Sequence, residues 1–360
     1  MVGEGYGAFQ LNLESQARLY RFYHRTLPTI STPRITEVYQ EYTTGLALAH
    51  PFLMHIILTI AITHDRHLLT PFTSTHQLAT PQESHLIQAE SQHRAQAANL
   101  LNSKLSRPIR PQDRDALWAA AAMLGISVLT ATEAPSVQDS WPLRTETNTN
   151  TGTNHPKTRT KTTPELQWMD FSINKKVIWN VTDPLREDSI FHVLADSYRE
   201  LMLQPQLCSA EEVAGEFVVL CGLGEAGASS FPAFGTDANP YSKAICMLTR
   251  MRGSGGGVAS SPEMLCAEGV MPRDLAFIGF MEAGFKALLG ERDARALLIL
   301  AFWYAPLCEG VWWIARRAWI ECRAICLYLE RWCGGDESVR RLLGVVRARC
   351  GLKLDDRMGA

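Results

Sequence analysis

The sequence lacks an excess of charge of either sign. Its 35 Lys and Arg residues nearly balance 37 Asp and Glu residues, which leaves a formal net charge of −2. Nucleic acids and anionic membranes attract proteins through a concentrated basic surface, and this composition offers none. With 46% hydrophobic residues over 360 positions, the chain is long enough to bury a large core. The composition therefore predicts a globular protein without direct DNA binding.

Cysteine is absent until Cys208, and the nine cysteines of the chain include no CxxC pair. An odd number of scattered cysteines favours reduced, buried thiols over a disulfide framework. Cys322 and Cys326 lie one helical turn apart, but two thiols alone make a weak metal site, so core packing is favoured. The N-terminus has no basic segment followed by an apolar one, and no secretory signal is expected. We predict a cytoplasmic protein, or a nuclear one if its role is regulatory.

An uninterrupted apolar run long enough to cross a membrane is also missing. The most apolar segment, residues 296–319, holds four of the nine tryptophans, but its run ends at Glu309. A bilayer span needs roughly 20 apolar residues. Pro306 lies within the segment, and Arg316 and Arg317 follow it. The sequence predicts no membrane span, and instead a buried helix or two helices that meet near Pro306.

Signatures of common catalytic machinery are missing as well. The chain has no G-x-S-x-G elbow, no Walker A loop and no HExxH motif. Gly222, Gly224 and Gly227 form a G-x-G-x-x-G pattern after the strand-like segment EFVVLC. A dinucleotide site needs these glycines to open a helix, whereas Pro232 follows too soon. A glycine turn that ends a helix is favoured, and we expect neither a metal ion nor a cofactor.

Segments with helical periodicity make up most of what is present. PFLMHIILTIAITHDRHLL begins at Pro51, the favoured first helical position, and is apolar nearly all round, which is typical of a core helix. SHLIQAESQHRAQAANLLNSKL and DALWAAAAMLGISVL follow as further helices, the latter with Asp113 or Asp115 as its N-cap. Few segments alternate as strands do. The sequence therefore predicts an all-α fold, a multi-helix bundle.

Two low-complexity segments interrupt this pattern. A threonine-rich polar insertion at about 134–164 has nothing to bury and predicts a disordered surface loop. A Gly-rich loop at about 252–262 predicts a flexible connection. Neither segment divides the chain, and we expect a single domain over residues 1–360.

Histidines gather around the first core helix, and His64-x-x-His67 resembles half of a metal site. No carboxylate pair lies on the same face, so buried histidines bonded to the backbone are favoured. A single histidine that faces an internal pocket is still able to transfer a proton. His55, His64 and Tyr304 are therefore weak catalytic candidates, and the catalytic residues stay unassigned.

The chain resembles the C-terminal regulatory domain of fungal binuclear zinc cluster transcription factors, in particular the sterol uptake control type. The resemblance rests on three segments in order: HPFLMHIILTIAITH, then AESQHRAQAANLL with DALWAAAAMLGI, then ARALLILAFWYAPLCEGVWWIARRAW. LQWMDFSINKKVIW is similar to the family's tryptophan-containing segment. The resemblance implies a helical bundle with an internal apolar cavity that binds a sterol-like molecule. Matching segments suggest as pocket wall Phe52, His55, Trp118, Trp303, Tyr304, Trp312 and Trp313. Plain core packing is the favoured alternative for each.

The chain departs from that family in its DNA-binding part. The family carries six closely spaced cysteines that bind two zinc ions, and no such cluster precedes Cys208. This departure argues against direct DNA binding and leaves two functions open, both with a small apolar molecule as partner. A homodimer is also left open.

In the first function, the domain serves fungal secondary metabolism and acts on a terpenoid or polyketide intermediate. It catalyses a cofactor-independent cyclisation or a pericyclic, Diels–Alder-like step, for which a shaped cavity and one or two hydrogen-bond donors suffice. In the second, it is a regulator or co-regulator that senses a sterol-like ligand. It then acts through a partner that reads DNA, or an upstream zinc-cluster exon is missing from the sequence.

Overall fold

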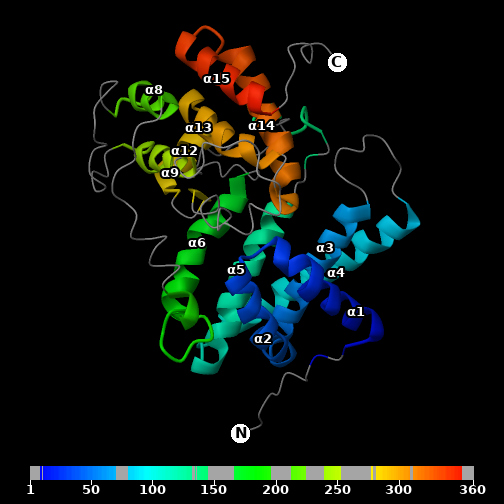
Figure 1. Ribbon diagram of the computed structural model, residues 1–360. Coiled ribbons are helices and arrows are strands. Elements are labelled where there is room, and N and C mark those ends of the chain that lie inside the picture. Colours follow the sequence, from blue (N-terminus) through cyan, green and yellow to red (C-terminus); the bar gives the residue numbers. More distant parts are fainter. Residues whose placement is uncertain are drawn as a thin grey trace, which may run out of the picture.

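The chain is described by a computed structural model that covers residue 9 and residues 11–69, 80–131, 134, 136–144, 166–195, 212–223, 239–252, 277–278, 281–308 and 311–350. Within these ranges every regular element is a helix and no strand occurs (Figure 1). The all-α prediction is confirmed. Nearly all of the predicted Gly-rich loop and most of the predicted insertion lie outside the described residues. The start of that insertion, residues 136–144, forms turns that bury Trp141.

Five consecutive helical elements build the N-terminal region. They are α1 (Leu13–Arg21), the π-helical turn η1 (Phe22–Thr26), the 3-10 turn η2 (Leu27–Thr29), α2 (Pro33–Ala49) and α3 (Pro51–Leu69). Thr32 caps α2 by accepting a hydrogen bond from the Ile35 N–H at 3.4 Å, and Pro33 occupies the first turn. α3 matches the predicted core helix and is buried over most of its length. No helix was predicted for α2.

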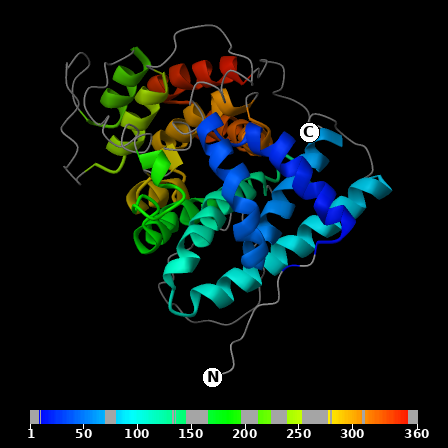
Figure 2. The ribbon, with the colours of Figure 1, turned by 60° about the horizontal axis from the view of Figure 1, so that its bottom comes forward.

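Two long helices pack against α3. α4 (Pro81–Leu105) runs along it (Figure 2), and α5 (Arg114–Thr130) contacts it as well. Asp113, one of the two residues predicted as N-cap, occupies the N-cap position of α5. Its carboxylate pairs with the Lys104 ammonium at 2.6 Å and does not cap the helix.

The middle of the chain contributes shorter helices. They are α6 (Gln167–Thr182), the 3-10 turn η5 (His192–Leu194), α8 (Glu212–Leu220), α9 (Ser242–Arg252) and α12 (Ala283–Gly290). The strand-like segment EFVVLC is helical up to Leu220, where α8 ends, and Cys221 begins the turn that follows. Gly222 has a φ of 66° and follows that helix, and its N–H donates to the Val219 carbonyl at 3.1 Å. The Leu223 N–H donates to the Val218 carbonyl at 2.8 Å, which completes a glycine-terminated helix end as predicted.

The C-terminal region consists of α13 (Ala294–Tyr304), the 3-10 turn η6 (Ala305–Cys308), α14 (Trp312–Trp332) and α15 (Glu337–Arg349). Pro306 lies within η6, so the most apolar segment is indeed two helices that meet near this proline. Of the helices in the described ranges, none combines the length and apolarity that a membrane crossing requires.

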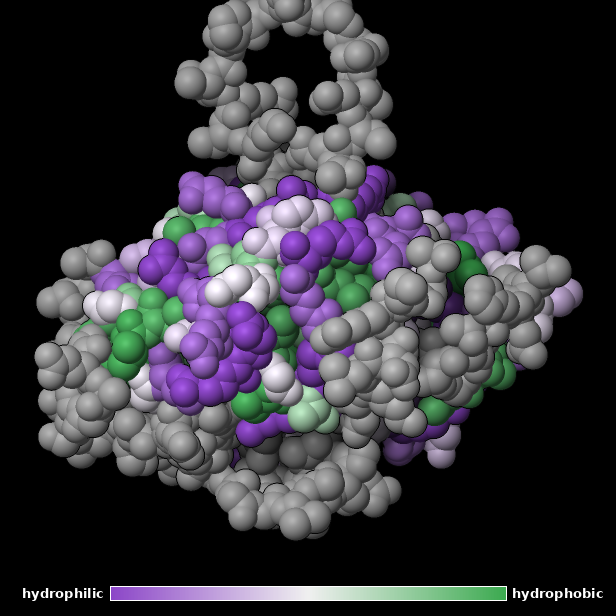
Figure 3. All heavy atoms as spheres, turned by 90° about the horizontal axis from the view of Figure 1, so that it is seen from above, coloured by the Kyte–Doolittle hydropathy of each residue, from purple (hydrophilic) through white to green (hydrophobic). Residues whose placement is uncertain are grey.

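Buried hydrophobic side chains from α1 to α15 form one connected core. All α13 side chains from Ala296 to Tyr304 are buried, so this helix is the most enclosed part of the C-terminal region. Hydrophilic residues cover much of the described surface in Figure 3, with smaller hydrophobic areas between them. α13 and the N-terminal half of α14 therefore meet in the interior, and four of the predicted site residues, Trp303, Tyr304, Trp312 and Trp313, belong to these two helices.

Candidate functional site

A layer of aromatic rings surrounds the C-terminal end of α13. The Trp303 ring is fully buried and lies nearly parallel to the Phe277 ring, with 5.1 Å between their centroids. On α6, the Trp168 ring also lies nearly parallel to it, at 6.0 Å. Tyr304 packs against Trp303 at 4.8 Å. Aromatic rings of this kind are the usual walls of small-molecule sites, and they are equally common in cores.

A buried polar group lies directly against this layer. The Tyr304 hydroxyl donates to Oε2 of Glu321 at 2.7 Å, and Glu321 forms an ion pair with Arg317 one turn earlier on α14. Arg317 also donates through Nε to the Leu129 carbonyl at 3.2 Å. Its remaining guanidinium donors bond to the carbonyls of Val128 and Ala131. Arg317 therefore satisfies the open C-terminal end of α5 while it neutralises Glu321.

The ionisation of Tyr304 is fixed by this environment. Burial raises the pKa of Tyr304 well above its usual value, and the neighbouring Glu321 carboxylate raises it further. The phenol is therefore protonated at physiological pH. It acts as a hydrogen-bond donor and is unsuited to act as a base.

Two buried indole N–H groups have no acceptor among the described residues, and one of them belongs to a ring of the aromatic layer. They belong to Trp168 and to Trp313, which lies one helical turn before Arg317. Residues four apart share a helix face, and the Arg317 guanidinium lies 5.5 Å from the Trp168 ring centroid. Trp313 therefore shares with Arg317 the face of α14 from which Arg317 reaches the Trp168 ring. A buried donor without a partner costs about 1–3 kcal/mol, and a ligand acceptor at this position removes that cost.

A second group of predicted residues lies where α14 begins. The His64 and Trp312 rings stack, with 4.4 Å between their centroids and 15° between their planes. The Trp312 indole N–H donates to Oγ1 of Thr29 at 2.8 Å, and Nδ1 of His64 lies 2.9 Å from Oγ1 of Thr26. Burial, helped by the charge of Arg25, lowers the pKa of His64 to about 4. The imidazole is therefore neutral at physiological pH.

The remaining predicted residues have other neighbours. Nδ1 of His55 lies 2.8 Å from Nδ1 of His93, and burial lowers the pKa of His55 to about 4. Both rings are neutral in such a pair, with one donating and the other accepting. Trp118 packs edge-on against Trp179 at 5.0 Å, and Phe52 is buried in α3. The predicted residues thus fall into several contact groups.

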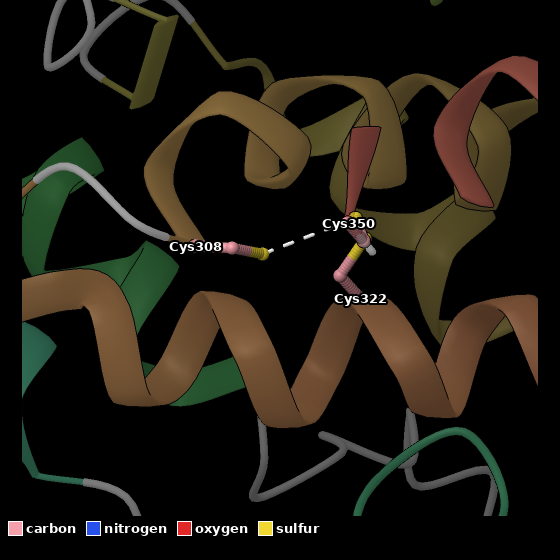
Figure 4. Close-up of side chains that lie close together, drawn as sticks. All are labelled: Cys308, Cys322 and Cys350. Carbon is pink, nitrogen blue, oxygen red and sulfur yellow. Dashed lines mark hydrogen bonds between the residues drawn. The ribbon is translucent and has the colours of Figure 1, made fainter. Parts of the chain in front are cut away.

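Three thiols also converge in the C-terminal region (Figure 4). They belong to Cys308 at the end of η6, Cys322 in α14 and Cys350 directly after α15. Hydrogen bonds from Cys308 and Cys322 lower the pKa of Cys350, and Arg323 and Arg349 act in the same direction. The sequence separations of 14 and 28 residues match no metal motif, so only the fold reveals this cluster.

Comparison with known protein families finds none that matches the chain, and comparison with curated proteins finds none with significant similarity. The resemblance to the fungal regulatory domain therefore stays a prediction. The functional argument depends on the geometry of the chain's own residues.

Proposed function

We propose that this chain is a stand-alone domain that binds an apolar small molecule inside its helical bundle. The observation that carries the proposal is that two buried indole N–H groups, of Trp168 in the aromatic layer and of Trp313 one helical turn from Arg317, have no acceptor among the described residues. A largely apolar ligand with one or two oxygen acceptors matches both features. Terpenoid and polyketide intermediates of fungal secondary metabolism have this composition, and an internal apolar cavity bounded by these rings is part of the proposal.

The proposed reaction is a cofactor-independent cyclisation or pericyclic, Diels–Alder-like step. The aromatic layer holds a flexible substrate in a folded conformer, which lowers the entropic part of the barrier. The N–H groups of Trp168 and Trp313 donate to a substrate carbonyl and withdraw electron density from the alkene conjugated with it. Because charge on that oxygen grows toward the transition state, these hydrogen bonds strengthen there. The new carbon–carbon bonds form from the π electrons of the substrate, and product and substrate are isomers.

Tyr304 and Arg317 act as positioning residues in this proposal. Tyr304 donates a hydrogen bond to Glu321, and Arg317 forms an ion pair with Glu321. The Arg317 guanidinium also lies over the Trp168 ring. Together they orient the indole of Trp168. His55 and His64, neutral and in other contact groups, have no step in the reaction.

A second candidate is a regulator that senses a sterol-like ligand, and Arg317 favours it. This side chain touches the aromatic layer through Trp168 and the end of α5 through the Leu129 carbonyl. A ligand beside Trp168 that moves Arg317 changes the contact between α14 and α5. Such a ligand shifts the protein between two states only if it binds them with different affinity. The regulator acts through a DNA-binding partner or as a homodimer.

The test is to incubate the purified full chain with a panel of linear polyene and terpenoid intermediates. The products are separated by chromatography, and their molecular masses are measured by mass spectrometry. The enzyme proposal expects a new isomer of unchanged mass. Saturable binding without an isomer supports the regulator instead, and absence of both binding and product contradicts the ligand-binding proposal.

Variants connect the result to the site. Trp168→Phe and Trp313→Phe keep a ring but remove the N–H donor, and each is expected to lower kcat at least about tenfold, in line with the loss of one transition-state donor. Trp332→Phe is the matched control because this tryptophan lies at the end of α14 and is 52% exposed. Equal activity of all three variants would contradict the assigned donor role.

A further inference from the structure

The three thiols of Cys308, Cys322 and Cys350 form a site that the proposed function does not use. Their sulfur atoms all lie within 4.8 Å of one another. The Sγ of Cys350 is 3.1 Å from that of Cys322 and 3.9 Å from that of Cys308. Figure 4 shows the side chains pointing toward one another from three separate elements.

The cluster is enclosed by the core. Cys322 is fully buried, and Cys308 and Cys350 are 3% and 5% exposed. The Sγ atom of Cys308 lies 3.4 Å from the Tyr304 carbonyl oxygen, and that of Cys322 lies 3.6 Å from the Ala301 carbonyl oxygen, so each thiol has a carbonyl as an alternative acceptor to Cys350. The Ala301 carbonyl also accepts a backbone hydrogen bond from Ala305, so its helical bond remains when Cys322 gives up its proton.

The spacing of the sulfur atoms suits one shared metal ion. Three sulfurs at about 2.3 Å from a common ion, the usual distance for zinc–thiolate bonds, lie about 4 Å apart in a trigonal plane. The observed separations are 3.1 Å, 3.9 Å and at most 4.8 Å, which is close to this value. Small side-chain rotations therefore complete the site without movement of the three helices.

The ligand set favours a soft ion of low coordination number. Within the described residues this is the one group of three or more Cys, His, Asp or Glu side chains close enough to hold an ion, and it contains thiols alone. Cys326 lies one turn from Cys322 but outside the mutually close set. A structural zinc site has four ligands, whereas thiolates select Cu(I) by their softness.

The surroundings also compensate charge. Arg323 on α14 directly follows Cys322 in the sequence, and Arg349 at the end of α15 directly precedes Cys350. Three thiolates with one monovalent ion carry two negative charges, and these two arginines supply two positive ones. A divalent ion in the same place leaves an excess of positive charge, which again favours the monovalent one.

We propose that Cys308, Cys322 and Cys350 bind one Cu(I) ion as a buried three-thiolate site. On binding, the three S–H groups release their protons to water and three copper–sulfur bonds form, with no change in oxidation state. The site fixes the end of α15 to η6 and α14. It is independent of the apolar-ligand proposal, since it uses none of the same side chains.

The first experiment titrates the fully reduced full chain with Cu(I) under anaerobic conditions, in competition with bathocuproine disulfonate. The expected result is one copper per chain by native mass spectrometry and three sulfur neighbours by X-ray absorption. No uptake in competition contradicts the proposal. Isolation of the chain with a Cys322–Cys350 disulfide that persists after reduction, detected as the loss of two hydrogen atoms in mass, also overturns it.

Variants identify the ligands. Cys322→Ala and Cys350→Ala are expected to weaken Cu(I) binding at least about 100-fold, since even outer-shell changes weaken metal sites by 10–100-fold. Circular dichroism and urea unfolding establish that each variant folds. Cys333→Ala, a partly exposed position after α14, is the control and retains wild-type affinity.

Cys326→Ala distinguishes the proposed site from a four-thiolate one. Retained Cu(I) affinity in this variant supports three-thiolate binding. A preference for Zn²⁺ over Cu(I) that disappears in Cys326→Ala indicates a tetrahedral zinc site and overturns the copper assignment. Because the readout is metal affinity and not turnover, failure here leaves the ligand-binding proposal untouched.

Discussion

The Asp65 ion pairs of the N-terminal helices α1 to α5 and the Arg317–Glu321 ion pair of the C-terminal helix α14 differ in their access to water. In the N-terminal helices, Asp65 pairs with Arg21 and Arg25, which are 36% and 44% exposed and reach water. In the C-terminal helices, the side chains of Arg317 and Glu321 are both 7% exposed. The three neighbouring thiols of Cys308, Cys322 and Cys350 are buried as well. The arginines that pair with Asp65 are partly solvated, whereas the Arg317–Glu321 ion pair is kept in the interior. Groups retained there against their desolvation cost are the better candidates for function.

The largest expected effect comes from Arg317→Met. The substitution leaves Glu321 without its counter-charge and leaves the carbonyls at the end of α5 without a donor. The free energy of unfolding, measured by urea denaturation, should fall by about 3–5 kcal/mol. Arg331→Met, an exposed position on the same helix, is the matched control and should change stability by less than about 0.5 kcal/mol. Equal losses of unfolding free energy in the two variants would contradict the distinction between a buried and an exposed arginine.

Tyr304→Phe is expected to have the next largest effect. It removes one hydrogen bond to the buried Glu321 carboxylate and keeps the ring in the aromatic layer. A hydrogen bond to a charged group contributes about 1.5–3 kcal/mol, and the unfolding free energy should fall by that amount. Tyr20→Phe on the surface, where the side chain is 66% exposed, should leave stability unchanged.

The pH dependence of stability should reveal the buried histidines of the N-terminal helices. Burial lowers the pKa of His64 from 6.5 to about 4, so this group stabilises the fold fully above pH 6.5. As the pH falls from 6.5 toward 4, the unfolded chain binds protons that the folded chain excludes, and stability decreases. His64→Gln should flatten this slope in urea unfolding measured across that range. His24→Gln, at an exposed position, is the control substitution.

The smallest expected effect is that of Asp65→Asn. Its arginine partners are partly exposed, and ion pairs of this kind contribute about 0.2–1 kcal/mol. Repeating the measurement at high salt should reduce the difference from the wild type further, because salt screens exposed pairs. A loss of unfolding free energy as large as that of Arg317→Met would contradict the proposed contrast between the Asp65 ion pairs and the Arg317–Glu321 ion pair.

Much of the helical architecture was predictable from the sequence. α3 has Pro51 at its start and an apolar surface all round, and Pro306 marks where α13 ends and η6 follows. Such local signals depend on the residues alone. α2 was missed because its threonines and charged residues weaken the helical pattern. EFVVLC was ambiguous because a short apolar run fits a strand or a buried helix equally well.

The candidate site was less predictable, because its parts come together only in the fold. Arg317 counted in the sequence as a charge that interrupts an apolar run, whereas in the structure it is buried and bonds to the end of α5. Trp168 lies in LQWMDFSINKKVIW, the segment that resembles the family's tryptophan-containing segment, but the sequence assigned it no role. Cys308, Cys322 and Cys350 follow no spacing rule, since the packing of η6, α14 and α15 alone decides that they meet.

The hydrogen bond from Trp312 to Thr29 joins residues that are 283 positions apart. Synthesis proceeds from the N-terminus, so Thr29 and His64 emerge from the ribosome long before their partner does. Closing so large a separation is slow compared with forming a helix. The face of α3 that carries His64 therefore cannot stack against Trp312 until almost the whole chain has been synthesised. The packing of the first helices to be synthesised thus depends on α14, one of the last helices to be made.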